Sequence, residues 1–261
     1  MKKASFYSFL TALIMLSSSF GYAQYSATIA SGRPGNANGA GTVGRGILQF
    51  QAGIQFAGYS DESGLSYSEF SENIVIRYGL TELFEISAVI NQANGKYDFS
   101  VANSEGLAIS GFNTTMLRAR LKVIDNLAVQ IGLNVPLLRN DFNNDYASPQ
   151  IKVMYNTNFS DKISFTTNLG AQWGEIENDP NGFYVFSFSA GLPSQFSLLL
   201  EAYGDFSIYG LQHFYDVGLG YLVNPNLLLD INAGWGNNFN VESYFVTAGV
   251  SYRLKVGNRD Q

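Results

Sequence analysis

The sequence predicts an all-β protein, a transmembrane antiparallel up-and-down β-barrel of about twelve strands. Three observations lead to this fold class. Apolar and polar residues alternate along twelve segments, each 9–12 residues long, which is the length that a tilted strand needs to cross a bilayer. The charged residues of these segments lie on the polar side of the alternation, and short joins between segments alternate with longer ones.

The alternation is clearest in residues 48–56 and 127–135. In the first stretch Leu48, Phe50 and Phe56 occupy even positions, whereas Gln49 and Gln51 occupy odd ones. A period of two residues places successive side chains on opposite faces of a strand. The twelve predicted strands are 47–57, 70–79, 83–91, 113–124, 126–136, 149–157, 162–173, 183–192, 195–206, 213–222, 226–235 and 243–254.

Charge placement is consistent with lipid on the apolar face. Only Glu72 departs from the polar side, and it lies near the end of its predicted strand. An Arg or Lys that faces lipid at the bilayer centre costs about 2–4 kcal/mol, so a lipid-facing surface excludes charge. A soluble sandwich shows the same alternation with the apolar face buried, so periodicity alone leaves both folds open.

Connection lengths and aromatic residues favour the membrane barrel. The joins after the even-numbered strands are tight, for example Asp125 and Asn224-Pro225, while those after the odd-numbered strands are mostly longer, up to about 92–112. Short periplasmic turns opposite long external loops are typical of outer-membrane barrels. Apolar-face aromatics such as Trp235 and Tyr252 fall at the strand ends, as expected for two interfacial girdles.

Composition limits the chemistry that the chain can carry. Its 261 residues include 15 Lys+Arg, 21 Asp+Glu, one His and no Cys, for a formal charge of −6. An acidic chain lacks the basic patch of a nucleic-acid binder. Without Cys, and with His213 as the single His, neither a disulfide framework nor a thiolate or multi-His metal site can form, and we predict no metal or cofactor.

The chain divides into four parts. Residues 1–23 have the features of a secretory signal, with Lys2 and Lys3 before an apolar run and Gly21-Tyr22-Ala23 as the cleavage site, so we expect cleavage after Ala23. We assign residues 24–46 to a periplasmic N-terminal segment, 47–254 to the outer-membrane barrel and 255–261 to a C-terminal tail. Residues 39–44 match G-x-G-x-x-G but lack the strand–helix context of a nucleotide site.

Charged residues on the polar faces predict two opposed walls inside the barrel, because the fourth and tenth strands of a closed twelve-strand ring face each other. Such walls would line a polar solute path or would form a salt-bridge network that fills a closed barrel, and both interpretations remain open. The basic wall comprises Arg77, Arg118, Arg120, Lys122 and Lys152, and the acidic wall comprises Glu201, Asp205, Asp216 and Asp230.

Several short stretches resemble one family of outer-membrane proteins. Arg33-Pro34-Gly35 followed by Thr42-Val43-Gly44-Arg45-Gly46, Arg77-Tyr78-Gly79-Leu80 before Glu85-Ile86, and Ser251-Tyr252-Arg253-Leu254 occur in the family's order. The chain therefore resembles transporters of the "MetA-pathway of phenol degradation" group over about residues 31–254. The resemblance implies a barrel that transports hydrophobic or aromatic compounds, and it transfers no binding residues.

We expect a monomeric protein of the outer membrane that contacts lipids and lipopolysaccharide and lets a small solute pass passively. The alternative is a non-conducting structural or surface-interaction barrel with a plugged lumen. We expect no enzyme, because a serine nucleophile needs a base within reach and nothing in the spacing of Ser187 and Ser189 points to His213.

Overall fold

The computed structural model describes residues 26–61, 63–99, 106–136, 141–142, 146–174, 179–208, 210–238 and 241–256. The signal sequence and residues 257–261 of the tail lie outside this part of the chain. The described residues form twelve strands and one short 3-10 helix: β1 (Ile47–Ser60), β2 (Leu65–Gly79), β3 (Phe84–Phe99), β4 (Leu107–Ile124), β5 (Leu127–Asn134), β6 (Ser148–Asn158), β7 (Ile163–Trp173), β8 (Pro180–Gly191), η2 (Pro193–Gln195), β9 (Phe196–Ser207), β10 (Gly210–Asn224), β11 (Leu227–Asn238) and β12 (Val241–Lys255).

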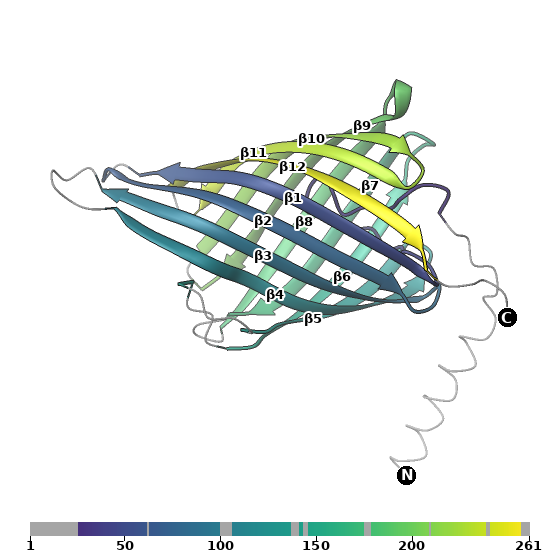
Figure 1. Cartoon of the computed structure of the whole chain (residues 1–261), viewed down its shortest axis with the longest axis horizontal. Coiled ribbons are helices and arrows are strands. Elements are labelled where there is room, and N and C mark those ends of the chain that lie inside the picture. The colour runs from purple at the N-terminus through teal and green to yellow at the C-terminus, as the bar shows by residue number, and fades with distance from the viewer. Residues whose placement is uncertain are drawn as a thin grey trace, which may run out of the picture.

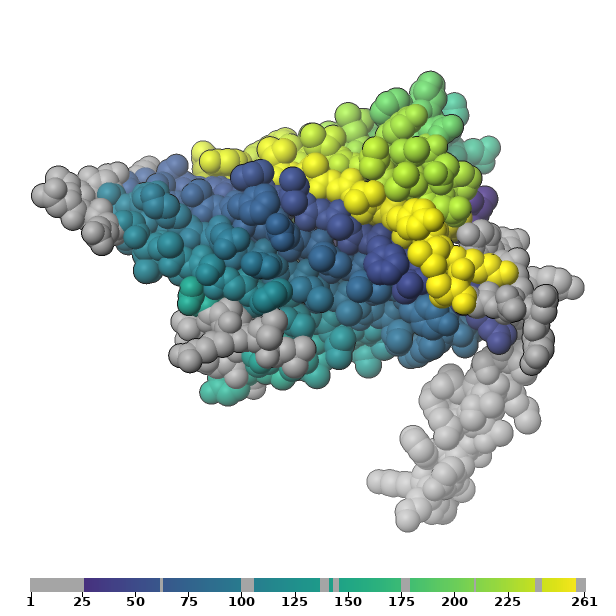
Figure 2. Space-filling model, viewed as in Figure 1, coloured from purple at the N-terminus to yellow at the C-terminus, as the bar shows by residue number. Residues whose placement is uncertain are grey.

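The strands form one closed antiparallel ring in chain order, which confirms the predicted fold class. The first and last strands complete the ring, with Gln51 of β1 opposite Val75 of β2 on one side and Ser251 of β12 on the other. Figure 2 shows this seam, where the purple surface of β1 lies directly against the yellow surface of β12. Closure leaves no unpaired sheet edge, which is a condition for a sheet that crosses a bilayer.

The barrel is apolar outside and polar inside. Along β1 the side chain of Gln49 is 1% exposed, whereas that of Phe56 is 59% exposed on the outer face. Arg77 and Glu85 are likewise buried on the inner face. An exterior of this kind is stable in lipid, where apolar contact costs nothing and a charge costs several kcal/mol. None of the described helices is long and apolar enough to cross a membrane.

The two ends of the ring differ. At one end, here called the turn end, tight connections such as Asp125-Asn126 and Pro225-Asn226 join the strands, and β1 begins and β12 finishes there (Figure 1). At the opposite end, the loop end, the connections after β3, β5 and β7 are longer. The predicted alternation of short and long joins is therefore present from β2 to β8, whereas the joins after β9 and β11 are as short as the turns.

Strands β2, β3 and β4 extend further toward the loop end than predicted. The expected join at 92–112 is mostly a hairpin, because β3 and β4 stay paired as far as Tyr97 and Leu107. A bulge explains the difference: Asn91 pairs with Thr114 and Gln92 with Phe112, so Asn113 is an extra residue that reverses the alternation. The same extension places Glu72 within β2 rather than near its end, with its side chain exposed.

Aromatic side chains gather at both ends of the outer face. Near the loop end the rings of Phe56 and Phe70 lie 4.9 Å apart, and those of Tyr215 and Trp235 lie 6.3 Å apart. Near the turn end Phe196 packs on Tyr221 at 4.8 Å. Amphipathic rings prefer the membrane interface, so these two groups mark the boundaries of the lipid-facing band.

Candidate functional site: a lumen divided by the N-terminal segment

Residues 26–46, here called the lumen segment, run inside the ring of strands before β1 begins. Figure 1 shows this purple trace passing behind the front wall near the turn end. The sequence predicts a periplasmic segment over 24–46, and the residues of this segment have no periodic pattern that would place it in the barrel. It has no regular secondary structure, so its backbone groups need partners from elsewhere once it is buried. The inner wall supplies those partners.

Three arginines of the wall bind carbonyl oxygens of the lumen segment. Arg253 of β12 donates to the carbonyls of residues 26, 27 and 28 at 3.0–3.1 Å. Arg77 of β2 donates to Ala30 at 2.9 Å, and Arg120 of β4 donates to Gly41 at 2.9 Å. A guanidinium presents five donors in a fixed fork, so one side chain can satisfy several carbonyls.

Carboxylates and amides of the wall accept from the N–H groups of the same segment. Glu201 of β9 accepts from the backbone of Asn36 at 2.6 Å and of Ala37 at 3.0 Å. Glu85 of β3 accepts from Val43 at 2.8 Å. Asn168 of β7 forms a reciprocal pair with the backbone of Asn38, at 2.8 and 2.7 Å. Strands on many sides of the ring thus hold one thin segment across the lumen.

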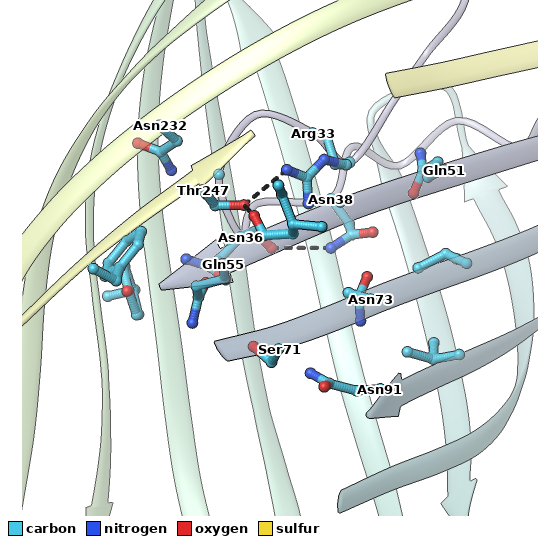
Figure 3. Close-up of a pocket in the computed structure, with 18 of the residues that line it drawn as sticks. Arg33, Asn36, Asn38, Gln51, Gln55, Ser71, Asn73, Asn91, Asn232 and Thr247 are labelled. Atoms are coloured by element: carbon cyan, nitrogen blue, oxygen red, sulfur yellow. Dashed lines mark hydrogen bonds between the residues drawn. The ribbon is translucent and has the colours of Figure 1, made fainter. Parts of the chain in front are cut away.

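Arg33 anchors the segment to the seam. Its guanidinium lies 3.0 Å from Asp230 of β11 and donates to the hydroxyl of Thr247 of β12 at 3.0 Å (Figure 3). It rests on Gly53 and Gly249, which are opposite each other in β1 and β12. A Cβ atom at either position would come within 2.5 or 2.6 Å of the guanidinium carbon, so only glycine leaves room for this side chain.

The glycine-rich stretch 39–44 is the last part of the lumen segment. Arg120 binds the carbonyls of Gly39 and Gly41, and the side chain of Asn156 accepts from the N–H of Ala40. Gly79 of β2 must lack a side chain because the carbonyl of Gly44 lies against it. The match to G-x-G-x-x-G therefore reflects close backbone packing against the wall.

The lumen segment separates two cavities. One, of about 450 Å³, lies toward the loop end, and its walls include Gln55, Asn73 and Arg118. The other, of about 1180 Å³, opens among the turns, with walls that include Leu83 and Asp125. Gly32, Arg33 and Asn38 line both cavities, so this stretch of the lumen segment lies between them.

The predicted basic residues all lie on inward positions, but they have different partners. Arg77 pairs with Glu85 at 2.9 Å, and Arg120 lies 3.9 Å from the same carboxylate. Lys122 pairs at 2.8 Å with Asp125, and its ammonium group lowers the pKa of that carboxyl by donating a hydrogen bond to it and by its positive charge. Arg118 donates to Ser87, and Lys152 lies 5.6 Å from the ring centre of Phe183.

The predicted acidic residues are distributed in the same way. Glu201 and Asp230 bind the lumen segment, as described above. Asp216 of β10 accepts from the amide of Asn232 at 3.1 Å. Asp205 of β9 is exposed and lies toward the loop end, opposite Gln212 of β10. Most of the lumen carboxylates are thus matched to a donor within the barrel.

Sequence reasoning missed several residues that hold the segment, among them Arg33, Glu85, Asn156, Asn168 and Arg253. The alternation puts Glu85 and Arg253 on the polar side of their strands, but neither residue belongs to the predicted basic or acidic wall. Arg33 precedes the barrel, so no strand pattern could locate it. One available signal was the facing glycine pair at positions 53 and 249, because glycine inside a strand often marks the close approach of another chain segment.

The comparisons with known proteins agree with this fold. The family model described as "Putative MetA-pathway of phenol degradation" matches residues 31–254. An outer membrane channel from Pseudomonas putida F1 is similar, with a TM-score of 0.62 and 12% identity over 82% of this chain and 98% of that one. The translocator domain of autotransporter NalP from Neisseria meningitidis has a TM-score of 0.54 and 11% identity over 81% and 89% of the two chains. The KdgM porin has a TM-score of 0.51 and 12% identity over 79% and 98%.

No curated protein matches the chain. At these identities the likeness to solved structures concerns the fold, which is a barrel found in outer membranes. Together with the apolar exterior and the two aromatic girdles, it places this protein in the outer membrane.

Proposed function

We propose that this chain, which belongs to the family described as "Putative MetA-pathway of phenol degradation", is a passive outer-membrane channel for small solutes. One observation carries the proposal: two cavities occupy the lumen, and Gly32, Arg33 and Asn38 of the lumen segment line both of them. A single extended stretch of chain is a thin barrier compared with a packed core. Its displacement would join the two cavities into one path between the ends of the barrel.

The solutes that we propose are small, and aromatic compounds are among them. The family description refers to phenol degradation, and one similar structure is an outer membrane channel. The loop-side cavity is also lined by the rings of Tyr203 and Phe245 beside many amide groups. A surface of this composition can contact an aromatic face and hydrogen-bond to a polar substituent.

We propose transport rather than catalysis. The hydroxyl of Ser187 lies beside Glu201, its register partner on β9, and the hydroxyl of Ser189 bonds to Ser164 at 2.7 Å. The ring of His213 packs edge-on against Tyr215 instead. Neither serine has this histidine beside it as a base, and the Glu201 carboxylate accepts from the backbone of Asn36 and Ala37. The similar solved structures include a channel and a porin, which supports the same view.

We also propose that the turn end faces the periplasm. Short turns lie on the periplasmic side of outer-membrane barrels, and the lumen segment enters the ring from that end. Export through a signal sequence over residues 1–23 fits this orientation, because the mature chain would then begin on the periplasmic side.

A reversible lock on the lumen segment tests the proposal. A Cβ atom at Gly218 of β10 would lie 2.9 Å from the Cβ of Pro34, which is within about 1 Å of the separation in a disulfide. The native chain has no cysteine, so a Pro34→Cys/Gly218→Cys variant adds one defined pair. Single-channel currents are recorded in planar bilayers before and after reduction, with the wild-type protein as the control that reduction should not change.

We expect steady openings of the reduced variant and of the wild type, and a fall in conductance when the disulfide forms. Equal conductance in both redox states would show that solutes pass beside the segment, and the segment would then have no part in control. Silence of the wild type and of the reduced variant would refute the channel. It would favour the alternative of a plugged structural barrel, for which the many hydrogen bonds that hold the segment are the supporting observation.

A further inference from the structure

We propose that the loop-side cavity is a binding site for a small organic anion, a carboxylate on a compact and partly aromatic body. This inference rests on the proposed function, because the ligand would be a solute on its way through the lumen. It goes beyond that function by assigning the charge of the solute and the residues that select it.

The charge of the cavity wall is positive although the whole chain is acidic. The described residues that line the cavity include Arg33, Arg118 and Lys152, and they include no Asp or Glu. Arg33 is neutralised by Asp230. Within the described part of the chain, Arg118 and Lys152 take part in no ion pair: Arg118 donates to the hydroxyl of Ser87, and Lys152 lies over the ring of Phe183.

The two cations lie on neighbouring parts of the inner wall. Gly132 of β5 lies opposite Arg118 of β4 on one side and Gln150 of β6 on the other, and Lys152 is the next inward residue of β6. Both cationic side chains line the same cavity. A carboxylate has two oxygens that can accept from a guanidinium and an ammonium group at once.

An anion would also relieve an electrostatic cost. Cations that are removed from bulk water without a partner are destabilising, and a bound carboxylate supplies the missing charge. The lumen carboxylates do not serve this purpose. Glu85, Glu201 and Asp230 already accept from arginines or from the lumen segment, and Asp205 and Asp216 do not line this cavity. The site is therefore complementary to an anion that comes from outside the protein.

The remaining lining groups define the body of the ligand. Asn91 and Asn232 line the cavity, and side-chain amides can hydrogen-bond to a polar substituent of a solute. Figure 3 shows Gln55, Asn73 and Asn91 on neighbouring strands around the same space as Arg33. The rings of Tyr203 and Phe245 offer apolar contact. A volume of about 450 Å³ equals that of about fifteen water molecules, enough for one small solute.

Direct binding tests the inference without depending on conduction. The purified barrel in detergent micelles is titrated calorimetrically with benzoate and, as the neutral isostere, with benzamide. The test variant is Arg118→Gln/Lys152→Gln. The matched control is Lys122→Gln, because Lys122 lines the turn-side cavity and pairs with Asp125. Arg118→Lys keeps the charge, and circular dichroism verifies that each variant is folded.

We expect the wild type to bind benzoate more tightly than benzamide. The double variant should lose about tenfold or more in benzoate affinity, because hydrogen bonds to charged groups are the stronger ones, and it should keep its affinity for benzamide. Lys122→Gln should bind benzoate like the wild type, and Arg118→Lys should keep most of the affinity. If the double variant does not fold, Arg118→Gln and Lys152→Gln are measured separately, and each should weaken benzoate binding.

Three results would overturn the anion site: equal affinity of the wild type for benzoate and benzamide, an unchanged benzoate affinity in the double variant, or an equal loss in Lys122→Gln. Bilayer recordings on the same samples keep the two proposals apart. Benzoate binding by a silent barrel would support the site and refute the channel, whereas conduction without selective benzoate binding would support the channel and refute the site.

Discussion

The ion pair between Arg33 and Asp230 should couple the lumen segment to the stability of the barrel. The two side chains are 14% and 0% exposed, and their charged atoms lie 3.0 Å apart. Removing one partner of a buried pair leaves the other charge uncompensated, which costs about 3–5 kcal/mol. The perturbation is a double-mutant cycle that combines Arg33→Gln with Asp230→Asn.

The structure predicts unequal effects of the two single substitutions. Arg33→Gln leaves the fully buried carboxylate of Asp230 without a cation and should cost about 3–5 kcal/mol. Asp230→Asn should cost less, about 1–3 kcal/mol, since the guanidinium is partly exposed and keeps the hydroxyl of Thr247 as an acceptor. The double variant replaces the pair by two amides that can bond to each other, so we expect a coupling energy of about 2–3 kcal/mol.

Urea unfolding of the protein in lipid vesicles measures the four free energies of unfolding. Lys96 and Asp98 provide the matched control, because their charged atoms are only 2.6 Å apart but their side chains are 58% and 50% exposed. Their cycle should give no more than about 1 kcal/mol. A coupling energy for Arg33 and Asp230 that is no larger than this control would refute the reasoning, and it would mean that the lumen segment leaves its site without affecting the barrel.

Three further predictions follow from the same geometry. Gly249→Val should displace the guanidinium that rests on this glycine and raise single-channel conductance, and an unchanged conductance would contradict the role of the glycine pair. Ile131→Arg places a charge on the outer face, where the native side chain is 59% exposed to lipid, and should cost about 2–4 kcal/mol in vesicle folding assays. Val123→Arg, on the same face near the turn end, should cost at most about 1 kcal/mol, and equal costs would show that the lipid-facing band is misplaced. On intact cells, a membrane-impermeant maleimide should label Asp179→Cys in a loop-end join but not Asp161→Cys in a turn, and the reverse would invert the orientation.

The inner face of the barrel does not accept an added charge at every position. Gln130 points inward on β5. Its side chain is 1% exposed, and its oxygen accepts from Arg120 at 3.2 Å. An added charge there would meet an existing cation in a filled space, so position 130 is no neutral control for lipid-face substitutions.

Local periodicity was enough to predict the barrel. A strand that separates lipid from a polar interior must alternate every second residue, and stretches such as 48–56 show this pattern without any knowledge of their neighbours. Charges at Arg77, Arg118 and Glu201 also had to face inward, because the lipid side excludes them. The confirmed fold class and family follow from these local rules and from short ordered motifs. The signal sequence and the function of the two charged walls stay predictions.

The tertiary structure alone decided where residues 26–46 lie and what the lumen charges bind. A segment without regular structure has no period, so its sequence does not show that Arg33 meets Asp230 or that Glu201 accepts from Asn36. These contacts join residues that are more than 160 positions apart. The bulge at Asn113 is a similar case, since one extra residue reverses the alternation that a sequence window measures. Local patterns determined which face of each strand is polar. Non-local packing determined the partners of the inward charges, for example that Arg77 pairs with Glu85 whereas Arg118 donates to Ser87.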